Sequence, residues 1–293
     1  MKRILFYIFY AFIYIITLLP LRILYIFSDL MFVLLYYFPS YRRKIVADNL
    51  KNSFPEKSEK ERKIIARRYY RHMADIIIET IKEMHLSKRQ VQKRFRIQNP
   101  ELYEKYYAQG RDVLAVCSHY NNWEWLSSFV LSSKLKCITA YKPLSNKFFD
   151  RMMLDIRSKY GTETAPTSAV LKRIVKYRMQ KMPTISAFIA DQTPPKGEHV
   201  HWTTFLNQDT SFYIGTEKVA VMLDMVVVFI HIKKIKRGFY EAESIVITEH
   251  PKDEPPGAIT EMHVRMLEKV IREEPEYWLW SHRRWKHKRP VND

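Results

Sequence analysis

Short apolar, β-rich runs alternate with helical stretches after about residue 110, and this alternation limits the possible fold more than any other feature of the chain. Strands that alternate with helices favour an α/β sandwich, in which helices flank a mixed, largely parallel sheet. The expected strands are Val113–Cys117, Cys137–Tyr141, Thr184–Ala190, Met225–Ile232 and Glu243–Thr248. The expected helices are Trp123–Lys134, Asn146–Lys159, Ser168–Met179, Thr216–Leu223 and Ile259–Glu273.

The N-terminal segment is strongly apolar. Ile4–Leu19 carries no charge and ends at Pro20, after which Leu21 to Phe38 continues apolar with few breaks. A ~30 Å bilayer core needs roughly 20 apolar residues, so the first stretch is short for a span. A signal peptide would need a small-residue cleavage site, and none follows. We interpret residues 1–40 as a membrane anchor followed by an interfacial helix, and we expect the anchor to be a transmembrane helix. The remaining residues, 41–293, form the main domain. A very apolar core helix of a soluble protein is the alternative.

Between the N-terminal segment and the first expected strand, a capping box predicts another helix. Ser58 and Glu61 have the spacing in which each side chain satisfies the other's backbone N–H. Apolar residues then recur at spacings of three and four from Ile64 toward Met84, and arginines and lysines lie between them. The charged face is directed either to water or to lipid headgroups, and the pattern does not separate the two.

The net charge of +18 restricts the partners of the chain rather than its fold. Nucleic acid, an anionic membrane surface and an acidic protein or phosphate-bearing substrate all fit it. We find no recognisable nucleic-acid-binding module, and such a role leaves the apolar N-terminus unexplained. The two cysteines, Cys117 and Cys137, form no C-x-x-C pair, and Cys117 is expected to be a buried, inert thiol.

A histidine and a glutamate flank the turn between the first expected strand and the helix after it. His119 follows Val113–Cys117, and Glu124 is the second residue of the helical stretch Trp123–Lys134. A carboxylate on one imidazole nitrogen fixes the tautomer and leaves the other nitrogen as a base. Sites of open α/β sheets form beyond the carboxyl ends of strands, where this turn lies. A catalytic His119–Glu124 pair and a structural pair that caps the helix both fit this context.

The segment His119-Tyr120-Asn121-Asn122-Trp123-Glu124 resembles the His-x4-Asp/Glu box of the glycerolipid acyltransferase superfamily, and in particular the late acyltransferases of lipid A biosynthesis. Further blocks of that family follow in order across nearly the whole chain. They are Tyr141–Asn146, Arg157-x3-Gly161-x-Glu163, Ala190-Asp191-Gln192 and Trp280–Lys286. Asn121 and Asn207 stand where the family usually has glycine. Asparagine is the non-glycine residue that best tolerates positive φ, so both positions are compatible with the same backbone.

The resemblance implies a mechanism and a set of site residues. His119, oriented by Glu124, would take the proton of an acceptor hydroxyl, whose oxygen attacks the carbonyl of an acyl thioester. Arg157 would stabilise the resulting oxyanion. Further residues are expected to bind substrate or to order the site: Asn122, Asn146, Asp191, Arg283 and Arg284. The donor is expected to be acyl carrier protein, whose acidity suits the net charge, or acyl-CoA; neither a cofactor nor a metal is expected.

The expected acceptor is a lipid A precursor or related glycolipid, at the cytoplasmic face of a bacterial inner membrane. Another polar lipid, such as an aminoacyl lipid or a lysophospholipid, is the alternative. A hydrolase would need a G-x-S-x-G elbow or an H-E-x-x-H metal site, and the sequence has neither. A basic membrane-surface or nucleic-acid-binding protein remains the alternative outside enzymes.

Overall fold

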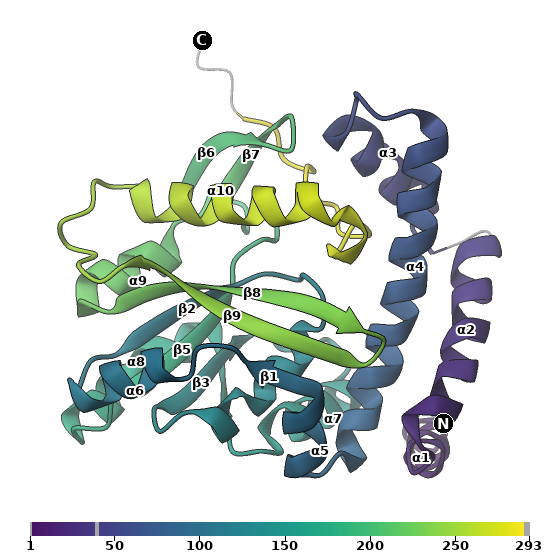
Figure 1. Ribbon diagram of the computed structural model, residues 1–293, viewed down its shortest axis with the longest axis horizontal. Coiled ribbons are helices and arrows are strands. Elements are labelled where there is room, and N and C mark those ends of the chain that lie inside the picture. Colours follow the sequence, from purple (N-terminus) through teal and green to yellow (C-terminus); the bar gives the residue numbers. More distant parts are fainter. Residues whose placement is uncertain (1, 39–40, 290–293) are drawn as a thin grey trace.

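The computed structural model describes residues 2–38 and 41–289 and has a seven-stranded sheet at its centre (Figure 1). The strand order is β1-β9-β8-β2-β5-β3-β4. The strands are β1 (Phe95–Ile97), β2 (Val113–Cys117), β3 (Lys136–Tyr141), β4 (Glu163–Pro166), β5 (Thr184–Ile189), β8 (Val226–Lys236) and β9 (Phe239–Thr248). Strands β8, β2, β5, β3 and β4 run parallel, whereas β9 is antiparallel to β8. The predicted mixed, largely parallel α/β sheet is therefore confirmed.

Strand β2 lies in the middle of the sheet, and all five of its residues are buried. Its side chains alternate between two apolar layers: Ala115 packs in the layer that contains Tyr103 and Trp125, and Val116 packs with Val170 on the other face. A continuous apolar run is typical of a parallel strand that is covered on both faces. The end of such a strand is held rigidly, which is what a site at that end requires.

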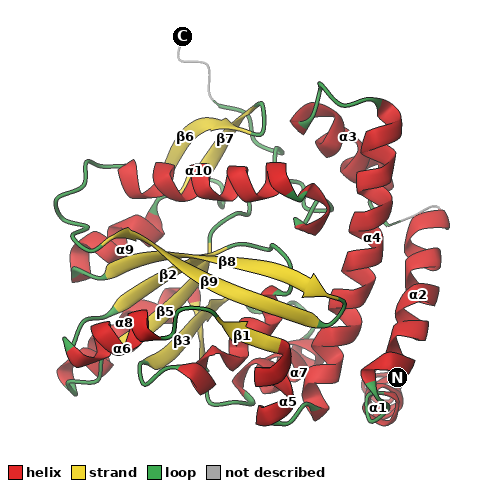
Figure 2. Cartoon of the chain, in the orientation of Figure 1, coloured by secondary structure: helices red, strands yellow, loops and turns green. Residues whose placement is uncertain are grey.

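Helices cover the sheet, and one β-hairpin lies beside α10 (Figure 2). The covering helices are α5 (Lys88–Arg94), α6 (Glu101–Ala108), α7 (Lys147–Ser158), α8 (Thr167–Met179), α9 (Gly215–Leu223) and α10 (Ala258–Glu273). Strands β6 (Val200–Phe205) and β7 (Gln208–Tyr213) form the hairpin, which packs on α10. The sequence interpretation missed this hairpin, the short strands β1 and β4, and helices α5 and α6. It also expected an α-helix at Trp123–Lys134, where the structure has the 3₁₀ helix η2 (Trp123–Ser132).

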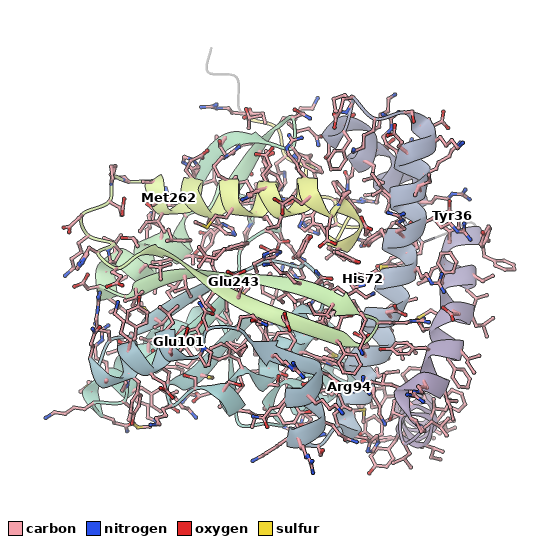
Figure 3. The ribbon with its side chains drawn as sticks, in the orientation of Figure 1. Tyr36, His72, Arg94, Glu101, Glu243 and Met262 are labelled. Atoms are coloured by element: carbon pink, nitrogen blue, oxygen red, sulfur yellow. The ribbon has the colours of Figure 1, made fainter. Side chains whose placement is uncertain are left out.

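Helix α4 (Glu59–Lys82) runs along one end of the sheet and begins at the predicted capping box. The Glu61 carboxylate accepts from the Ser58 backbone N–H at 2.7 Å, and the Ser58 hydroxyl accepts from Glu61 N–H at 3.3 Å. The short helices α3 (Arg43–Ser53) and η1 (Glu83–His85) precede and follow α4. In Figure 3, His72 marks the point where α4 lies beside the end of β8, and its Nδ1 is 3.2 Å from Lys234 Nζ.

The N-terminal segment forms two short helices, α1 (Lys2–Ile16) and α2 (Leu21–Tyr37), which lie outside α4 (Figure 1). Pro20 separates them, because its ring removes a backbone donor and ends the first helix. Within the described residues, no helix combines the length and apolar character that a membrane crossing requires. The expected transmembrane anchor is therefore unsupported. The expected domain boundary at residue 40 lies outside the described residues.

Candidate active site

Two neighbouring strands bring His119 and Asp191 together. Strands β2 and β5 are parallel, and Cys117 at the end of one is paired in register with Ile189 at the end of the other. His119 and Asp191 each lie two residues beyond these strand ends. The two chains leave the sheet at the same level, so the side chains meet at its carboxyl edge, where α/β folds place their sites.

The Asp191 carboxylate orients the His119 imidazole. Asp191 Oδ1 lies 2.7 Å from His119 Nδ1, and Asp191 Oδ2 accepts from the His119 backbone N–H at 2.9 Å and from Trp278 Nε1 at 2.8 Å. Burial raises the pKa of the Asp191 carboxyl, but the imidazole and these donated hydrogen bonds outweigh it and lower the pKa to about 2. Asp191 is therefore ionised at neutral pH, and its charge holds a proton on Nδ1 of His119.

The other imidazole nitrogen points outward. His119 Nε2 lies 3.2 Å from the side-chain nitrogen of Gln192, which is exposed. The His119 side chain is 17% exposed, whereas that of Asp191 is 2% exposed. The indole of Trp123 packs edge-on against the imidazole, with ring centroids 5.2 Å apart. With the proton on Nδ1, the Nε2 lone pair accepts from the exposed Gln192 amide, and a reactant that displaces this amide could use Nε2 as a general base.

Glu124 is bound to Arg157 and not to His119. Arg157 Nε and Nη2 donate to the two Glu124 carboxylate oxygens at 2.8 and 2.7 Å, which makes a bidentate ion pair. Burial lowers the pKa of the Arg157 guanidinium, but the hydrogen bonds and charge of Glu124, together with the charges of Glu83 and Asp150, raise it overall, so the cation is retained. The structure thus corrects the expected His119–Glu124 pair, because the carboxylate at the imidazole belongs to Asp191.

Both asparagines at the family's glycine positions adopt left-handed backbone. Asn121 has φ 53° and Asn207 has φ 62°. The Asn121 side chain also donates to the Ile232 carbonyl at 2.7 Å, so the turn after β2 is fixed to β8. The two departures from the family pattern therefore keep the backbone that glycine would adopt.

The sequence profile described as bacterial lipid A biosynthesis acyltransferase matches residues 1–287. The chain belongs to this family. It is accordingly an acyltransferase of lipid A biosynthesis. Comparison with curated proteins found no match.

The other predicted site residues of the acyltransferase lie at different depths. Asn122 is buried, and its Oδ1 accepts from Trp125 N–H at 3.2 Å at the start of η2. Asn146 is exposed and caps α7 by accepting from the backbone N–H groups of Phe148 and Phe149. It therefore orders the start of the helix that carries Arg157.

The two tail arginines separate. Arg283 is exposed, whereas Arg284 is 1% exposed and its Nη2 donates to the Ser211 carbonyl at 2.6 Å. The Arg284 guanidinium also lies 4.4 Å from the Phe212 ring centroid. Burial lowers the pKa of Arg284 to about 10. The expectation that Arg284 binds substrate is corrected, because its guanidinium is buried beside β7.

The sequence interpretation missed how the C-terminal block holds the site. Trp278 Nε1 donates to Asp191, and His282 Nε2 accepts from the Thr193 backbone N–H at 3.1 Å. The segment after β5 is thus fastened to the tail on both sides of Gln192. The tail tryptophans were visible in the sequence, but nothing local indicates that an indole N–H more than eighty residues away reaches Asp191.

Proposed function

We propose that the enzyme transfers an acyl chain from a thioester to a hydroxyl of a lipid A precursor or related glycolipid, with His119 as the general base. The observation that carries this proposal is the imidazole itself: Asp191 holds Nδ1, and Nε2 faces outward beside Gln192. Nε2 would take the proton of the acceptor hydroxyl as its oxygen attacks the thioester carbonyl. The proton then passes to the departing thiolate, so no proton is lost from the site.

Arg157 is proposed to stabilise the oxyanion of the tetrahedral intermediate. Its ion pair with Glu124 uses Nε and Nη2, which leaves Nη1 outside that pair. A guanidinium fixed by a bidentate carboxylate needs little rearrangement when negative charge develops, which is the condition for electrostatic stabilisation. In this proposal Glu124 acts by holding Arg157.

The proposed donor is acyl carrier protein, with acyl-CoA as the alternative. The chain carries a net charge of +18, which complements the negative charge of either donor. Of the two donors, the acidic carrier protein is the larger. Exposed cations occur near the site in the C-terminal tail, including Arg283 and Lys286. We propose that Arg283 contributes to binding phosphate groups of the donor or of the acceptor.

The proposed place of the reaction is the cytoplasmic face of the inner membrane. Helices α1 and α2 expose many large apolar side chains, among them Ile8 (63%), Ile15 (65%) and Ile26 (68%). Phe148 and Phe149 of α7 pack against Phe6 of α1, with ring centroids 5.0 and 5.3 Å apart. Exposed Arg22, Arg42 and neighbouring cations suit anionic headgroups. We propose that α1 and α2 lie in the membrane interface.

The test is an acyl-transfer assay with labelled acyl carrier protein, acyl-CoA and candidate lipid acceptors. We expect the wild-type protein to acylate a lipid A precursor and H119A to lose on the order of 10²–10⁴ in rate. H250A is the matched control, because His250 is exposed and its backbone N–H makes only a local bond to Thr248. Undiminished transfer by H119A would refute the general-base role. Transfer to an aminoacyl lipid or lysophospholipid alone would replace the acceptor.

A further inference from the structure

Glu79 is a completely buried carboxylate in the last turn of α4, and three side chains donate hydrogen bonds to it. Tyr25 donates to Oε1 at 2.7 Å, Asn122 Nδ2 donates to Oε2 at 2.7 Å, and the Tyr240 hydroxyl donates to Oε2 at 2.8 Å. Glu79 is 0% exposed. An isolated buried carboxylate is strongly unfavourable, so its presence here depends on donors that use both of its oxygens.

One of those donors belongs to the turn between His119 and Glu124. The Asn122 amide nitrogen donates to Glu79, and the Asn122 amide oxygen accepts from Trp125 N–H at 3.2 Å. Trp125 Nε1 in turn donates to the main-chain carbonyl of Glu79 at 3.2 Å. The turn is therefore attached to Glu79 through Asn122 and through Trp125, which lie on either side of Glu124 in the sequence.

We propose that Glu79 is a positioning residue that sets the orientation of Asn122 and thereby the spacing between His119 and the Glu124–Arg157 pair. The inference rests on the proposed function of those residues in acyl transfer. If the Asn122 amide turned over, its nitrogen would face Trp125 N–H and the start of η2 would lose its cap. A carboxylate prevents this, because it accepts hydrogen bonds and cannot donate them when ionised.

The charged and titratable groups around Glu79 come from four elements. Asp75 lies on α4, Lys234 on β8, Tyr25 on α2 and Tyr240 on β9. Burial, followed by the charge of Asp75, raises the pKa of Glu79 to about 7. A carboxyl that shares a proton with a second carboxyl in this setting would titrate at higher pH still.

The experiment exchanges the polarity of the hydrogen bond. In the wild type the Asn122 amide nitrogen lies 2.7 Å from a Glu79 carboxylate oxygen, and N122D places a second carboxyl group in the position of that amide. The pair must then share a proton or move apart. E79Q/N122D restores one donor and one acceptor in reverse order, and the carboxylate of N122D can still accept from Trp125 N–H. N52D is the matched control, because it makes the same change of side chain at an exposed residue of α3.

We expect kcat for acyl transfer by N122D to fall on the order of 10- to 100-fold at pH 8 and to recover partly as the pH is lowered. We expect E79Q/N122D to regain most of this loss with a pH profile like that of the wild type, and N52D to retain activity. A double variant as slow as N122D, or an N122D enzyme as fast as the wild type, would overturn the proposal. A loss that merely reflects stability would follow the melting temperature and would not change the pH profile.

A second measurement does not depend on activity. In protein with ¹⁵N-labelled histidine, the Nδ1 proton of His119 reports its hydrogen bond to Asp191. We expect its resonance to shift in N122D and to return in E79Q/N122D, whether or not a donor and acceptor have been found. An unchanged resonance in N122D would overturn the positioning role. Absence of any acyl transfer by the wild type would instead count against the proposed function.

Discussion

The partner of an imidazole decides which of its two nitrogens can act as a base. For His119 that partner is Asp191, whose side chain is only 2% exposed. Three donors on the Asp191 carboxylate keep it ionised. An ionised carboxylate both fixes the tautomer and stabilises the imidazolium that forms when Nε2 accepts a proton.

Replacement of Asp191 by asparagine should test this directly. The D191N amide can donate to Nδ1, which would place the histidine proton on Nε2 and remove the base. We expect acyl transfer to fall on the order of 10³–10⁴, as tautomer reversal does in hydrolytic triads. D155N is the control, because Asp155 is an exposed partner of Arg151 on α7. A D191N enzyme that stays folded and retains the rate of D155N would show that Asp191 does not orient the base.

At the residue scale the sequence was informative where chemistry is local. The expected turn around His119 and the positive φ of Asn121 and Asn207 agree with the structure. The carboxylate partner was assigned to Glu124, five residues away, because the His-x4-Glu pattern is local. Asp191 lies 72 residues from His119, and the two meet only because β2 and β5 are neighbours in register. Strand order is a long-range property that no local pattern reveals.

Helix α4 shows the same limit at the scale of an element. Its capping box and its apolar periodicity predicted the helix, and the predicted charged face was described from arginines and lysines alone. The structure buries Asp75 and Glu79 of α4 and Glu83 of η1, which are spaced four residues apart. Periodicity of apolar residues cannot identify such acids, because their partners lie on other elements: Tyr25, Asn122 and Ser127.

Glu83 should make stability depend on pH. Burial, and more weakly the charge of Glu124, raises its pKa to about 8, and Ser127 donates to one of its oxygens. Because the folded-state pKa is raised, stability is fully present below the unfolded pKa of 4.5 and is lost as the pH rises toward 8. Replacing Glu83 with glutamine, which has no such titration, should flatten this loss.

We expect the unfolding free energy of E83Q to fall less than that of the wild type between pH 6.5 and 8, by about 2 kcal/mol. This window avoids His263 and His282, whose pKa values burial lowers to about 4 and which destabilise the fold only as pH falls below 6.5. Urea unfolding at the two pH values provides the measurement, and E59Q, at an exposed position of α4, is the control. Equal pH slopes for E83Q and the wild type would contradict the assignment.

At the scale of the whole molecule, polar bonds fasten the apolar N-terminal helices to the rest of the chain. Ser28 donates to Asp75 at 2.7 Å, and Lys82 donates to the carbonyls of Thr17 and Leu19 at 2.7 and 2.9 Å. The sequence showed an apolar segment but not these attachments, which depend on α4 lying alongside. Because α1 and α2 are fixed in place, a membrane that binds their exposed face would also fix the orientation of the site above it.

Binding to lipid vesicles should therefore need both the apolar face and the positive charge. We expect I8N/I15N to bind anionic vesicles more weakly by at least about tenfold. Burying one exposed isoleucine in the membrane interface should contribute about 1.5–3 kcal/mol to the binding free energy, and the two substitutions remove this contribution. M179N/M222N is the control, since both methionines are exposed apolar residues on other helices. Raising the salt concentration toward 1 M should weaken wild-type binding, as the Debye length shrinks to ~3 Å. Equal flotation of both variants with anionic vesicles would refute docking through α1. Binding that is insensitive to salt would instead leave apolar burial as the only force that holds the protein on the membrane.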